Sequence, residues 1–405
     1  MSFQQGLSGL NAAAKNLDVI GNNVSNASTV GFKQSQAQFA DVYANSLTGA
    51  GGSGIGIGVK VAQVAQQFTQ GNITATNNPL DMAINGGGFF RMDNGGEIAY
   101  QRNGQFQLDK NGYIVNPTGA KLTGYTANAS GVLSTGAPAP LAINTADLTP
   151  QATTEVNAVL NLDSTETALA AASFDMNDPT TYHSSTAVSV YDSLGNQHTL
   201  QTYYVKTGAG TWNVYAASDG TAIPAAGTAV STLTFNGSGV LTAGGQFSVT
   251  APVTTGANPI TAAFDFTGTT QFGSAFSVNT LNQDGYTSGR LAGFNIGADG
   301  TVLGRYTNGQ SAVLGQVVLA NFANPNGLQQ MGNNMWTETA TSGTPLVGTP
   351  DSGGLGVLQS SAVEDSNVDL TAELVNMITA QRVYQANAQT IKSQDAVLQT
   401  LVNLR

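Results

Sequence analysis

Apolar residues recur at helical spacing at both ends of the chain, most regularly at the C-terminal end. No proline follows Pro350 and no glycine follows Gly356, so residues 357–405 contain no helix breaker. Large side chains in that stretch follow the seven-residue period of a coiled-coil seam, at Leu370, Leu374, Met377, Tyr384, Ile391, Leu398 and Val402. The pattern predicts one helix from residue 369 to about residue 402, roughly 50 Å long at 1.5 Å per residue.

A second stripe begins at the N-terminus. Its apolar residues alternate four- and three-residue steps, at Phe3, Leu7, Leu10, Ala14, Leu17 and Val24. Residues 21–23 are typical of a helix end or interruption. Both stripes are also typical of amphipathic helices on a globular core, and the pattern alone leaves that alternative open. Because neither stripe is flanked by core sequence, we favour pairing of these helices, with each other or with other subunits.

The segment after the first stripe is predicted to contain a short helix and a linker. Residues 33–46 place Phe39, Val42 and Tyr43 on one helical face. Residues 49–58 are rich in glycine and predict a flexible linker. This linker contains a G-x-G-x-x-G run, but a dinucleotide site needs a strand before it and a helix after it, and the flanking patterns are the reverse.

Residues 72–359 have the pattern of a β protein. Short alternating segments are separated by turn residues, and residues 186–191 and 197–206 predict two strands joined by a tight connection. Residues 207–283 contain two charged residues, Asp219 and Asp265, which marks a compositional shift. We interpret residues 145–284 as a separate unit inserted into a first β domain.

The predicted fold is therefore mixed α and mainly β, with long terminal helices forming a coiled-coil-like layer and two all-β domains, the outer inserted into the inner. The helical part comprises residues 1–32 and 360–405, and residues 33–71 connect it to the β region. The inner β domain is discontinuous, residues 72–144 and 285–359, and residues 145–284 form the outer one.

Composition narrows the function classes. Charged residues make up 9% of the 405 residues, the net charge is −11, and 13 basic residues cannot form the patch that nucleic acid needs. The chain has no cysteine, which excludes disulfides and thiolate chemistry. We expect no membrane-spanning helix, because no apolar run reaches 18 residues, and no secretory signal peptide, because the N-terminus lacks a basic lead and an apolar core.

Candidate chemistry is sparse. The two histidines, His183 and His198, lack metal-ligand spacing, and we interpret His198 as a residue on a strand surface. No G-x-S-x-G elbow occurs. We predict no enzyme, cofactor or metal, although a polysaccharide-active enzyme with a carboxylate pair and a secreted β-rich adhesin stay open as alternatives.

Four motifs are more specific. The run Gly21-Asn22-Asn23-Val24-Ser25-Asn26, continuing to Gly31-Phe32-Lys33, resembles the N-terminal signature of the bacterial flagellar rod, hook and hook-associated axial proteins. The run Ser366-Asn367-Val368-Asp369-Leu370 resembles their C-terminal signature, and residues 80–90 and 100–109 resemble their inner β domain. The residues of the terminal motifs that we single out are Asn22, Asn23, Asn26, Gly31, Phe32, Asn367 and Asp369.

The insert at residues 145–284 resembles the hook members of this family rather than the shorter rod proteins, so a distal rod protein is the alternative within the family. The resemblance implies a structural subunit that polymerises into a flexible hollow tube, a universal joint carrying motor torque from rod to filament. It implies that both apolar stripes are assembly surfaces. The implied partners are further copies of the chain, rod protein, hook cap, hook–filament junction protein and the flagellar type III export apparatus. The implied location is the extracellular hook, reached without a cleaved signal peptide.

Overall fold

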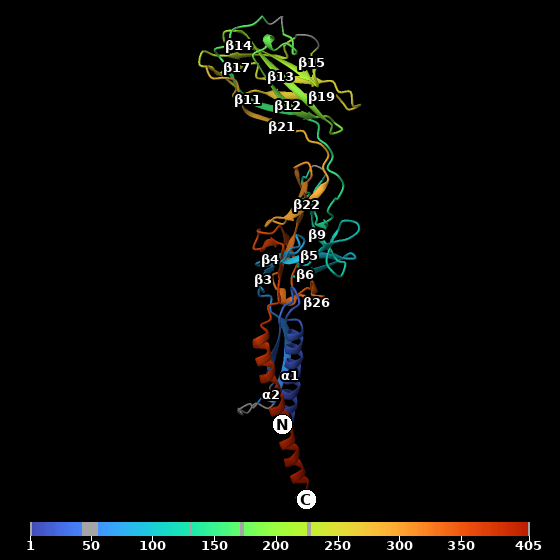
Figure 1. Cartoon of the computed structure of the whole chain (residues 1–405). Coiled ribbons are helices and arrows are strands. Elements are labelled where there is room, and N and C mark those ends of the chain that lie inside the picture. Colours follow the sequence, from blue (N-terminus) through green and yellow to red (C-terminus); the bar gives the residue numbers. More distant parts are fainter. Residues whose placement is uncertain (1, 43–55, 129–130, 171–173, 225–227, 404–405) are drawn as a thin grey trace. The chain divides into compact units, whose positions relative to one another are not determined.

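The computed structural model describes residues 2–42, 56–128, 131–170, 174–224 and 228–403. The chain forms two compact units (Figure 1). The first unit contains residues 1–144, 293–304 and 311–405, and the second contains residues 145–292 and 305–310. The mainly β composition, the helix near each end and the insertion of one unit into the sequence of the other confirm the predicted fold class.

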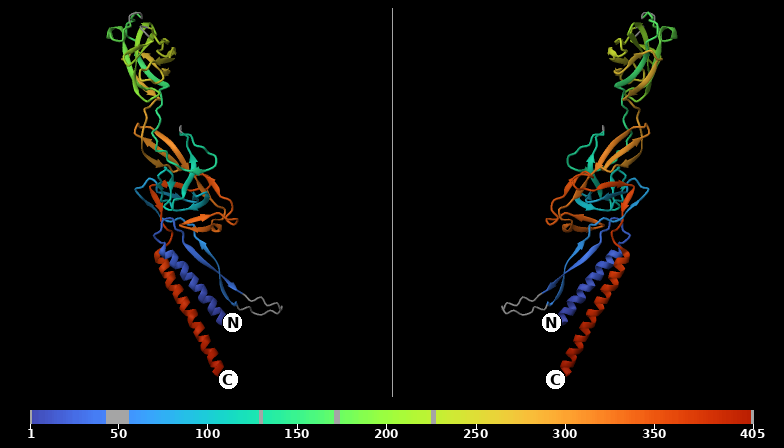
Figure 2. Two further views of the ribbon diagram at one scale, coloured as in Figure 1. Left: turned by 90° about the vertical axis from the view of Figure 1, so that its right-hand side faces the viewer. Right: turned by 90° about the vertical axis from the view of Figure 1, so that its left-hand side faces the viewer.

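Two helices of the first unit pair antiparallel. Helix α1 (Ser2–Ser25) and helix α2 (Leu370–Asn403) lie side by side in both views of Figure 2. The side chain of Asn23 lies beside Glu373 near one end, and Gly6 lies beside Ile391 near the other. The predicted C-terminal helix is confirmed, whereas α1 continues through residues 21–23, where we expected an end or interruption.

The predicted helix over residues 33–46 is wrong. Strand β1 (Ser35–Val42) pairs antiparallel with β2 (Gly58–Gln66), with a bulge at Gln38/Phe39. The spacing of Phe39 and Val42 fits a helix, but the backbone hydrogen bonds of this segment are satisfied by β2, so tertiary pairing overrides the local pattern. Most of the glycine-rich stretch, residues 49–55, lies outside the described residues.

The rest of the first unit is built from short strands. Among the described residues the largest sheet has 13 strands, with the order β22-β23-β24-β9-β5-β6-β27-β26 along its main path. The strands of this sheet are β5 (Phe89–Asn94), β6 (Glu97–Gln101), β7 (Gln107–Leu108), β8 (Ile114–Val115), β9 (Lys121–Thr126), β10 (Ala139–Pro140), β22 (Leu291–Ile296), β23 (Thr301–Tyr306), β24 (Ser311–Val317), β25 (Leu319–Asn321), β26 (Gln329–Gly332), β27 (Met335–Thr337) and β28 (Leu346–Gly348).

Two further strand pairs bring distant segments of the first unit together. Strand β4 (Met82–Asn85) pairs with β29 (Val357–Ser360), and β3 (Ile73–Ala75) pairs with β30 (Ala362–Glu364). A short 3-10 helix, η3, spans Pro325–Gly327. Phe89, Tyr100, Phe322 and Trp336 form an aromatic core with edge-to-face contacts, which holds this part of the unit together.

The second unit is built from two sheets around one core. The five-stranded sheet contains β11 (Glu155–Asp163), β18 (Gln246–Ala251), β19 (Ile260–Asp265), β20 (Thr270–Phe272) and β21 (Ser277–Gln283). The six-stranded sheet contains β12 (Ser184–Tyr191), β13 (Gln197–Gly208), β14 (Thr211–Ser218), β15 (Thr221–Ile223), β16 (Ser231–Phe235) and β17 (Leu241–Ala243). The 3-10 helix η2 (Pro179–Thr181) precedes β12.

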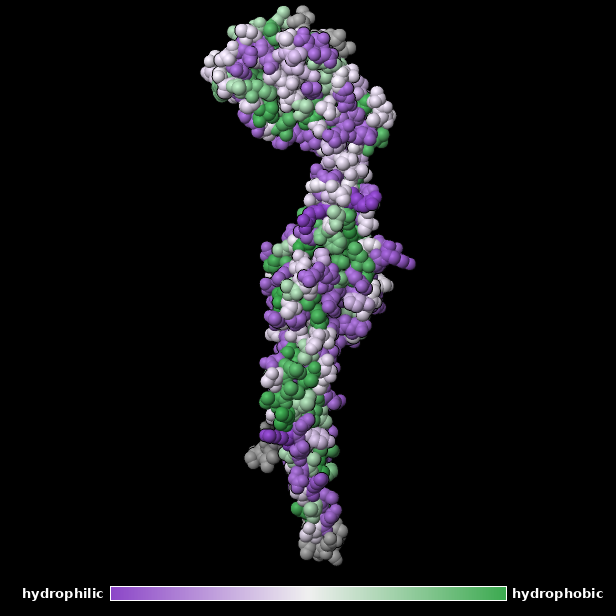
Figure 3. Space-filling model, in the orientation of Figure 1, coloured by the Kyte–Doolittle hydropathy of each residue, from purple (hydrophilic) through white to green (hydrophobic). Residues whose placement is uncertain are grey.

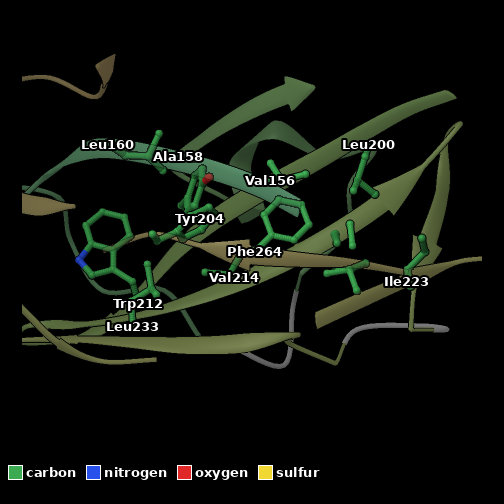
Figure 4. Close-up of a cluster of buried hydrophobic side chains, with 14 of the residues drawn as sticks. Val156, Ala158, Leu160, Leu200, Tyr204, Trp212, Val214, Ile223, Leu233 and Phe264 are labelled. Atoms are coloured by element: carbon green, nitrogen blue, oxygen red, sulfur yellow. The ribbon is translucent and has the colours of Figure 1, made fainter. Parts of the chain in front are cut away.

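Side chains of both sheets meet in the core of the second unit (Figure 4). Val156 of β11 and Phe264 of β19 come from one sheet, and Tyr204 of β13 and Trp212 of β14 from the other. The predicted pair of strands, β12 and β13, is confirmed as an antiparallel hairpin. The chain has two tryptophans, so Trp212 marks the core of the second unit and Trp336 that of the first.

Candidate assembly surface

The contact between α1 and α2 is made largely by small residues. A Cβ atom added at Gly6 would lie 3.1 Å from Cγ1 of Ile391, and one added at Gly9 would lie 2.7 Å from Oδ1 of Asn387. Ala13 of α1 and Ala380 of α2 are buried as well. Small side chains allow the two backbones to approach closely, so this seam uses little of the large apolar surface that the helices carry.

The large apolar residues of α1 lie beside the seam. Phe3 and Leu7 are exposed by 45% and 44%, and Leu10, Leu17 and Val24 are half-buried. The seam residues of α1 follow the spacing 6, 9, 13, 16, 20 and 23, so the predicted stripe is displaced from it around the helix. The structure therefore leaves this stripe available to other molecules.

The predicted stripe of α2 is split between two environments. Met377 and Ile391 are half-buried beside α1, and Tyr384 lies at the edge of the seam, 37% exposed. Leu370, Leu374 and Leu398 are exposed, and the side chain of Val402 lies outside the described residues. Figure 3 shows hydrophobic surface gathered over the first turns of α2.

Among the described side chains of α2, four large exposed apolar residues lie outside the predicted stripe: Val375, Ile378, Val383 and Val397. A strict heptad template omits them. The small and polar residues Glu373, Ala380 and Asn387 recur at seven-residue spacing and mark the seam. A residue that faces a closely packed helix is small or hydrogen-bonded, so this spacing is the signal that locates the seam in the sequence.

A buried ion cluster lies where the helices meet the β part of the first unit. The carboxylate of Glu364, at the end of β30, accepts hydrogen bonds from Lys33 Nζ at 2.6 Å, Arg102 Nη1 at 3.1 Å and the backbone N–H of Gly71 at 2.9 Å. The side chains of Lys33 and Glu364 are fully buried. Burial lowers the pKa of Lys33, and the carboxylate of Glu364 acts in the opposite direction. Sequence reasoning missed this cluster, since 331 residues separate its two main members.

Two motif asparagines join the helices to the hairpin. Asn23 of α1 exchanges two hydrogen bonds with the backbone of Ser35, at 2.8 and 2.9 Å. Asn367 accepts from the backbone N–H of Gln34 at 2.7 Å and donates to the carbonyl oxygen of Gln67 at 2.8 Å. These side chains replace backbone partners that the helix ends and the strand ends lack.

The other motif residues have local roles. Asp369 caps α2 by accepting hydrogen bonds from the backbone N–H groups of residues 371 and 372, at 2.8 and 3.1 Å. Asn26 donates to the carbonyl oxygen of Asn22, which is exposed. Gly31 has φ +70° and lies against the backbone of residue 103, so no side chain fits there, and the neighbouring Phe32 is buried.

We expected His198 on the surface of a strand, but it is buried in the second unit and only 7% exposed. Its Nδ1 lies 2.6 Å from a carboxylate oxygen of Asp219 and its Nε2 3.3 Å from one of Asp192. The hydrogen bond with Asp219 raises the pKa of His198, although burial opposes this. Burial alone would raise the pKa of Asp192, but hydrogen bonds from Asn196 and Thr255 hold it well below its usual range.

The described residues show neither a metal centre nor a membrane-spanning helix. They contain no group of three or more His, Asp or Glu side chains placed to hold a metal ion. In the part of the chain that the structure describes, neither helix is long and apolar enough to cross a membrane.

Sequence models of four flagellar domains match successive parts of the chain. They are the flagella basal body rod protein at residues 3–33, the flagellar hook protein FlgE/F/G D1 domain at 83–158, the flagellar basal body protein FlaE D2 domain at 161–286 and the flagellar basal body rod FlgEFG protein C-terminal domain at 359–404. The paired terminal helices and two β units therefore belong to the class of flagellar rod and hook proteins. Full-length relatives are more specific, and by them the chain belongs to the flagellar hook protein family.

The relatives cover the whole chain. It is 47% identical over 410 residues to the flagellar hook protein FlgE of Salmonella typhimurium and 45% identical over 410 residues to that of Escherichia coli, with 100% of each chain covered. It is 33% identical over 465 residues to the hook protein of Treponema pallidum, covering 100% of this chain and 99% of the relative. The crystal structure of Helicobacter pylori flagellar hook protein FlgE2 shares the fold, with a TM-score of 0.54 and 15% identity over 72% of this chain and 100% of that one.

Proposed function

We propose that this chain is the subunit of a flexible hollow tube, the flagellar hook, which copies of the chain build by self-polymerisation and which transmits motor torque from rod to filament. Membership of the hook protein family supports this function over a distal rod protein or an adhesin. The observation that carries the proposal is that different residues of the terminal helices make the contact within the chain and face outward. Mostly small residues, with Ile20, Met377 and Ile391, make the contact within one chain, and large apolar residues such as Leu370, Leu374 and Leu398 point to its outside.

Exposed apolar stripes favour association. Leu370, Leu374 and Ile378 lie near one another on the first turns of α2, each about half exposed. Burying a leucine or isoleucine side chain completely is worth about 1.5–3 kcal/mol relative to full exposure. Several such side chains in each copy, repeated along a polymer, supply enough free energy to hold neighbouring helices together.

The assembly residues of the proposal are those of the two stripes: Phe3, Leu7, Leu10, Leu17, Val24, Leu370, Leu374, Met377, Tyr384, Ile391, Leu398 and Val402. In the tube, residues 1–32 and 360–405 form the helical layer, residues 33–71 connect it, residues 72–144 and 285–359 form the inner β domain and residues 145–284 the outer one. The division of the chain into compact units near residue 144 supports this arrangement.

The proposal also assigns partners and a place. Besides further copies, the chain meets rod protein, hook cap and hook–filament junction protein, and it leaves the cell through the flagellar type III export apparatus without a cleaved signal peptide. The absence of cysteine suits export as an unfolded chain, because no disulfide can form before threading. We propose a purely structural role, without enzymatic activity.

A single charge on the stripe tests the proposal. Leu374→Asp places a carboxylate on the exposed apolar surface, and we expect it to prevent the formation of tubes seen by negative-stain electron microscopy. Ser393→Asp adds the same charge to another side of the same helix and should leave the tubes intact. Because Leu374 is 44% exposed, the folding of the monomer should not change. Normal tubes from Leu374→Asp would contradict the proposal.

A further inference from the structure

A groove of about 920 Å³ runs between α1, α2 and the β1–β2 hairpin. Ala12, Ala13 and Ala380 contribute small side chains to its lining, and Phe39 and Val383 contribute larger apolar ones. Phe39 and Val383 are 42% and 48% exposed, so this surface is open. Its lining extends along α1 from Gly9 to Asn23, about 21 Å at 1.5 Å per residue.

Within the part of the chain that the structure describes, the end of α2 extends beyond α1. The antiparallel register sets Asn23 beside Glu373, Gly9 beside Asn387 and Gly6 beside Ile391. The same register brings the first residue of α1, Ser2, opposite a position close to residue 395, yet α2 continues to Asn403. We call residues 396–403 the overhang. It measures about 12 Å at 1.5 Å per residue, and it exposes Val397 and Leu398 by 54% and 53%.

Neither the groove nor the overhang presents an unpaired charge to the other. Residues 396–403 contain no charged residue. The charged residue that lines the groove is Glu373, and its carboxylate is already buried under hydrogen bonds from Gln34 at 2.7 Å and Asn23 at 3.4 Å. An uncharged helix can therefore enter the groove without leaving an unpaired charge in either partner.

We propose that the overhang of one copy docks in the groove of a second copy. A chain cannot fill its own groove in this way, because its overhang continues the straight axis of α2 away from α1. The contact joins two different surfaces, so it does not close on itself in a dimer and adds copies in one direction. The inference rests on the proposed function, since it names which surfaces meet in the polymer.

Cysteine cross-linking tests the contact, because the chain contains no cysteine of its own. Copies carrying Val397→Cys are mixed with copies carrying Val383→Cys, assembled into tubes and oxidised mildly. The control mixture pairs Val397→Cys with Ser393→Cys, since Ser393 is exposed, like Val383, but does not line the groove and lies outside the apolar stripe. A disulfide needs Cα atoms roughly 4.4–6.8 Å apart, so we expect about tenfold more cross-linked heterodimer from the groove pair than from the control.

Two outcomes overturn the inference: equal cross-linking of both mixtures, or more from Ser393→Cys. If Val383→Cys does not assemble, Thr379→Cys supplies a second groove position and the same comparison is made with it. Failure of this inference and failure of the proposed function are distinct. Tubes without the groove cross-link refute the docking alone, whereas an unmodified chain that forms no tubes refutes the function.

Discussion

Neutralising Glu364 should destabilise the first unit strongly. In Glu364→Gln the shape of the side chain is kept, but its negative charge is lost between the ammonium of Lys33 and the guanidinium of Arg102. The side chains of Lys33 and Arg102 are 0% and 4% exposed, so water cannot replace the missing partner. The amide nitrogen of glutamine would also point donors at groups that can only donate.

The expected loss follows from the geometry. Removing one member of a buried, hydrogen-bonded ion pair costs about 3–5 kcal/mol, because a charge stays buried without compensation. Lys33 can limit its share by losing its proton. For a lysine with an unfolded pKa near 10.4, that costs about 5 kcal/mol at pH 7, since each pKa unit is worth 1.36 kcal/mol. We therefore expect the free energy of unfolding of the first unit to fall by about 3–5 kcal/mol.

The two tryptophans allow each unit to be measured by itself. In a Trp212→Phe background, urea unfolding followed by fluorescence reports Trp336 and hence the first unit alone. Trp212→Phe removes no hydrogen bond, because the indole N–H of Trp212 has no partner among the described residues. Asp18→Asn is the matched control, since the pair of Lys15 and Asp18 is 67% exposed on both sides and worth little.

The pH dependence gives a second readout. Burial already lowers the pKa of Lys33, and losing Glu364 lowers it further, so the unfolded chain binds more protons than the folded one below pH 10.4 or so. The deficit of Glu364→Gln should therefore shrink as pH rises toward that value. The reasoning is refuted if Glu364→Gln costs no more than Asp18→Asn, or if its deficit is the same at pH 7 and near pH 10.

Two further predictions use the same fluorescence assay. Because the pKa of His198 is raised in the folded state, its contribution to the stability of the second unit is complete below about pH 6.5 and is lost as pH rises through the folded pKa. His198→Asn should therefore flatten the pH dependence of urea unfolding, which Trp212 reports in a Trp336→Phe background. An unchanged pH dependence would exclude His198 as its source. Gly31→Ala should destabilise the first unit by about 2–5 kcal/mol, because the backbone at Gly31 is left-handed and the added Cβ would press against residue 103. In Gly21→Ala the added Cβ meets nothing within 4 Å, so this substitution should stabilise α1 by about 0.5–1 kcal/mol. Equal effects of the two substitutions would contradict the account of Gly31.

The terminal helices were predictable because their apolar pattern repeats over many residues. Helix α2 begins and ends within about one residue of the expected positions. The contact faces of the two helices were not predictable, because hydrophobicity alone does not separate a seam within one chain from one between chains. In α1 the seam contains one large apolar residue, Ile20, and the small residues Gly6, Gly9 and Ala13, which a search for large apolar residues passes over.

The remaining errors share one cause, which is contact between distant segments. Strand β1 looked helical because its partner β2 lies beyond a glycine-rich stretch. His198 looked exposed because the two carboxylates that bury it come from separate turns, at Asp192 and Asp219. The cluster around Glu364 joins three stretches of sequence that no local pattern relates.

Three of the few charged residues of this chain are buried together at one junction of the first unit. The ion cluster of Lys33, Arg102 and Glu364 is buried at the point where the helices meet the β part of the first unit, and breaking it there is expensive. In residues 207–283 of the second unit the two carboxylates are already hydrogen-bonded within their own unit, Asp219 to His198 and Asp265 to Gln246 and Thr267.

Residues 207–283 therefore offer a neighbouring copy two carboxylates and no cation, which limits the number of fixed ion pairs at this surface. Surfaces of amides, hydroxyls and small apolar groups can exchange one neighbour for another at similar free energy, whereas an ion pair favours one register over the others. A bending tube needs both behaviours, and we propose that the buried cluster of Lys33, Arg102 and Glu364 keeps each copy rigid while the charge-poor surface of residues 207–283 lets neighbouring copies exchange contacts.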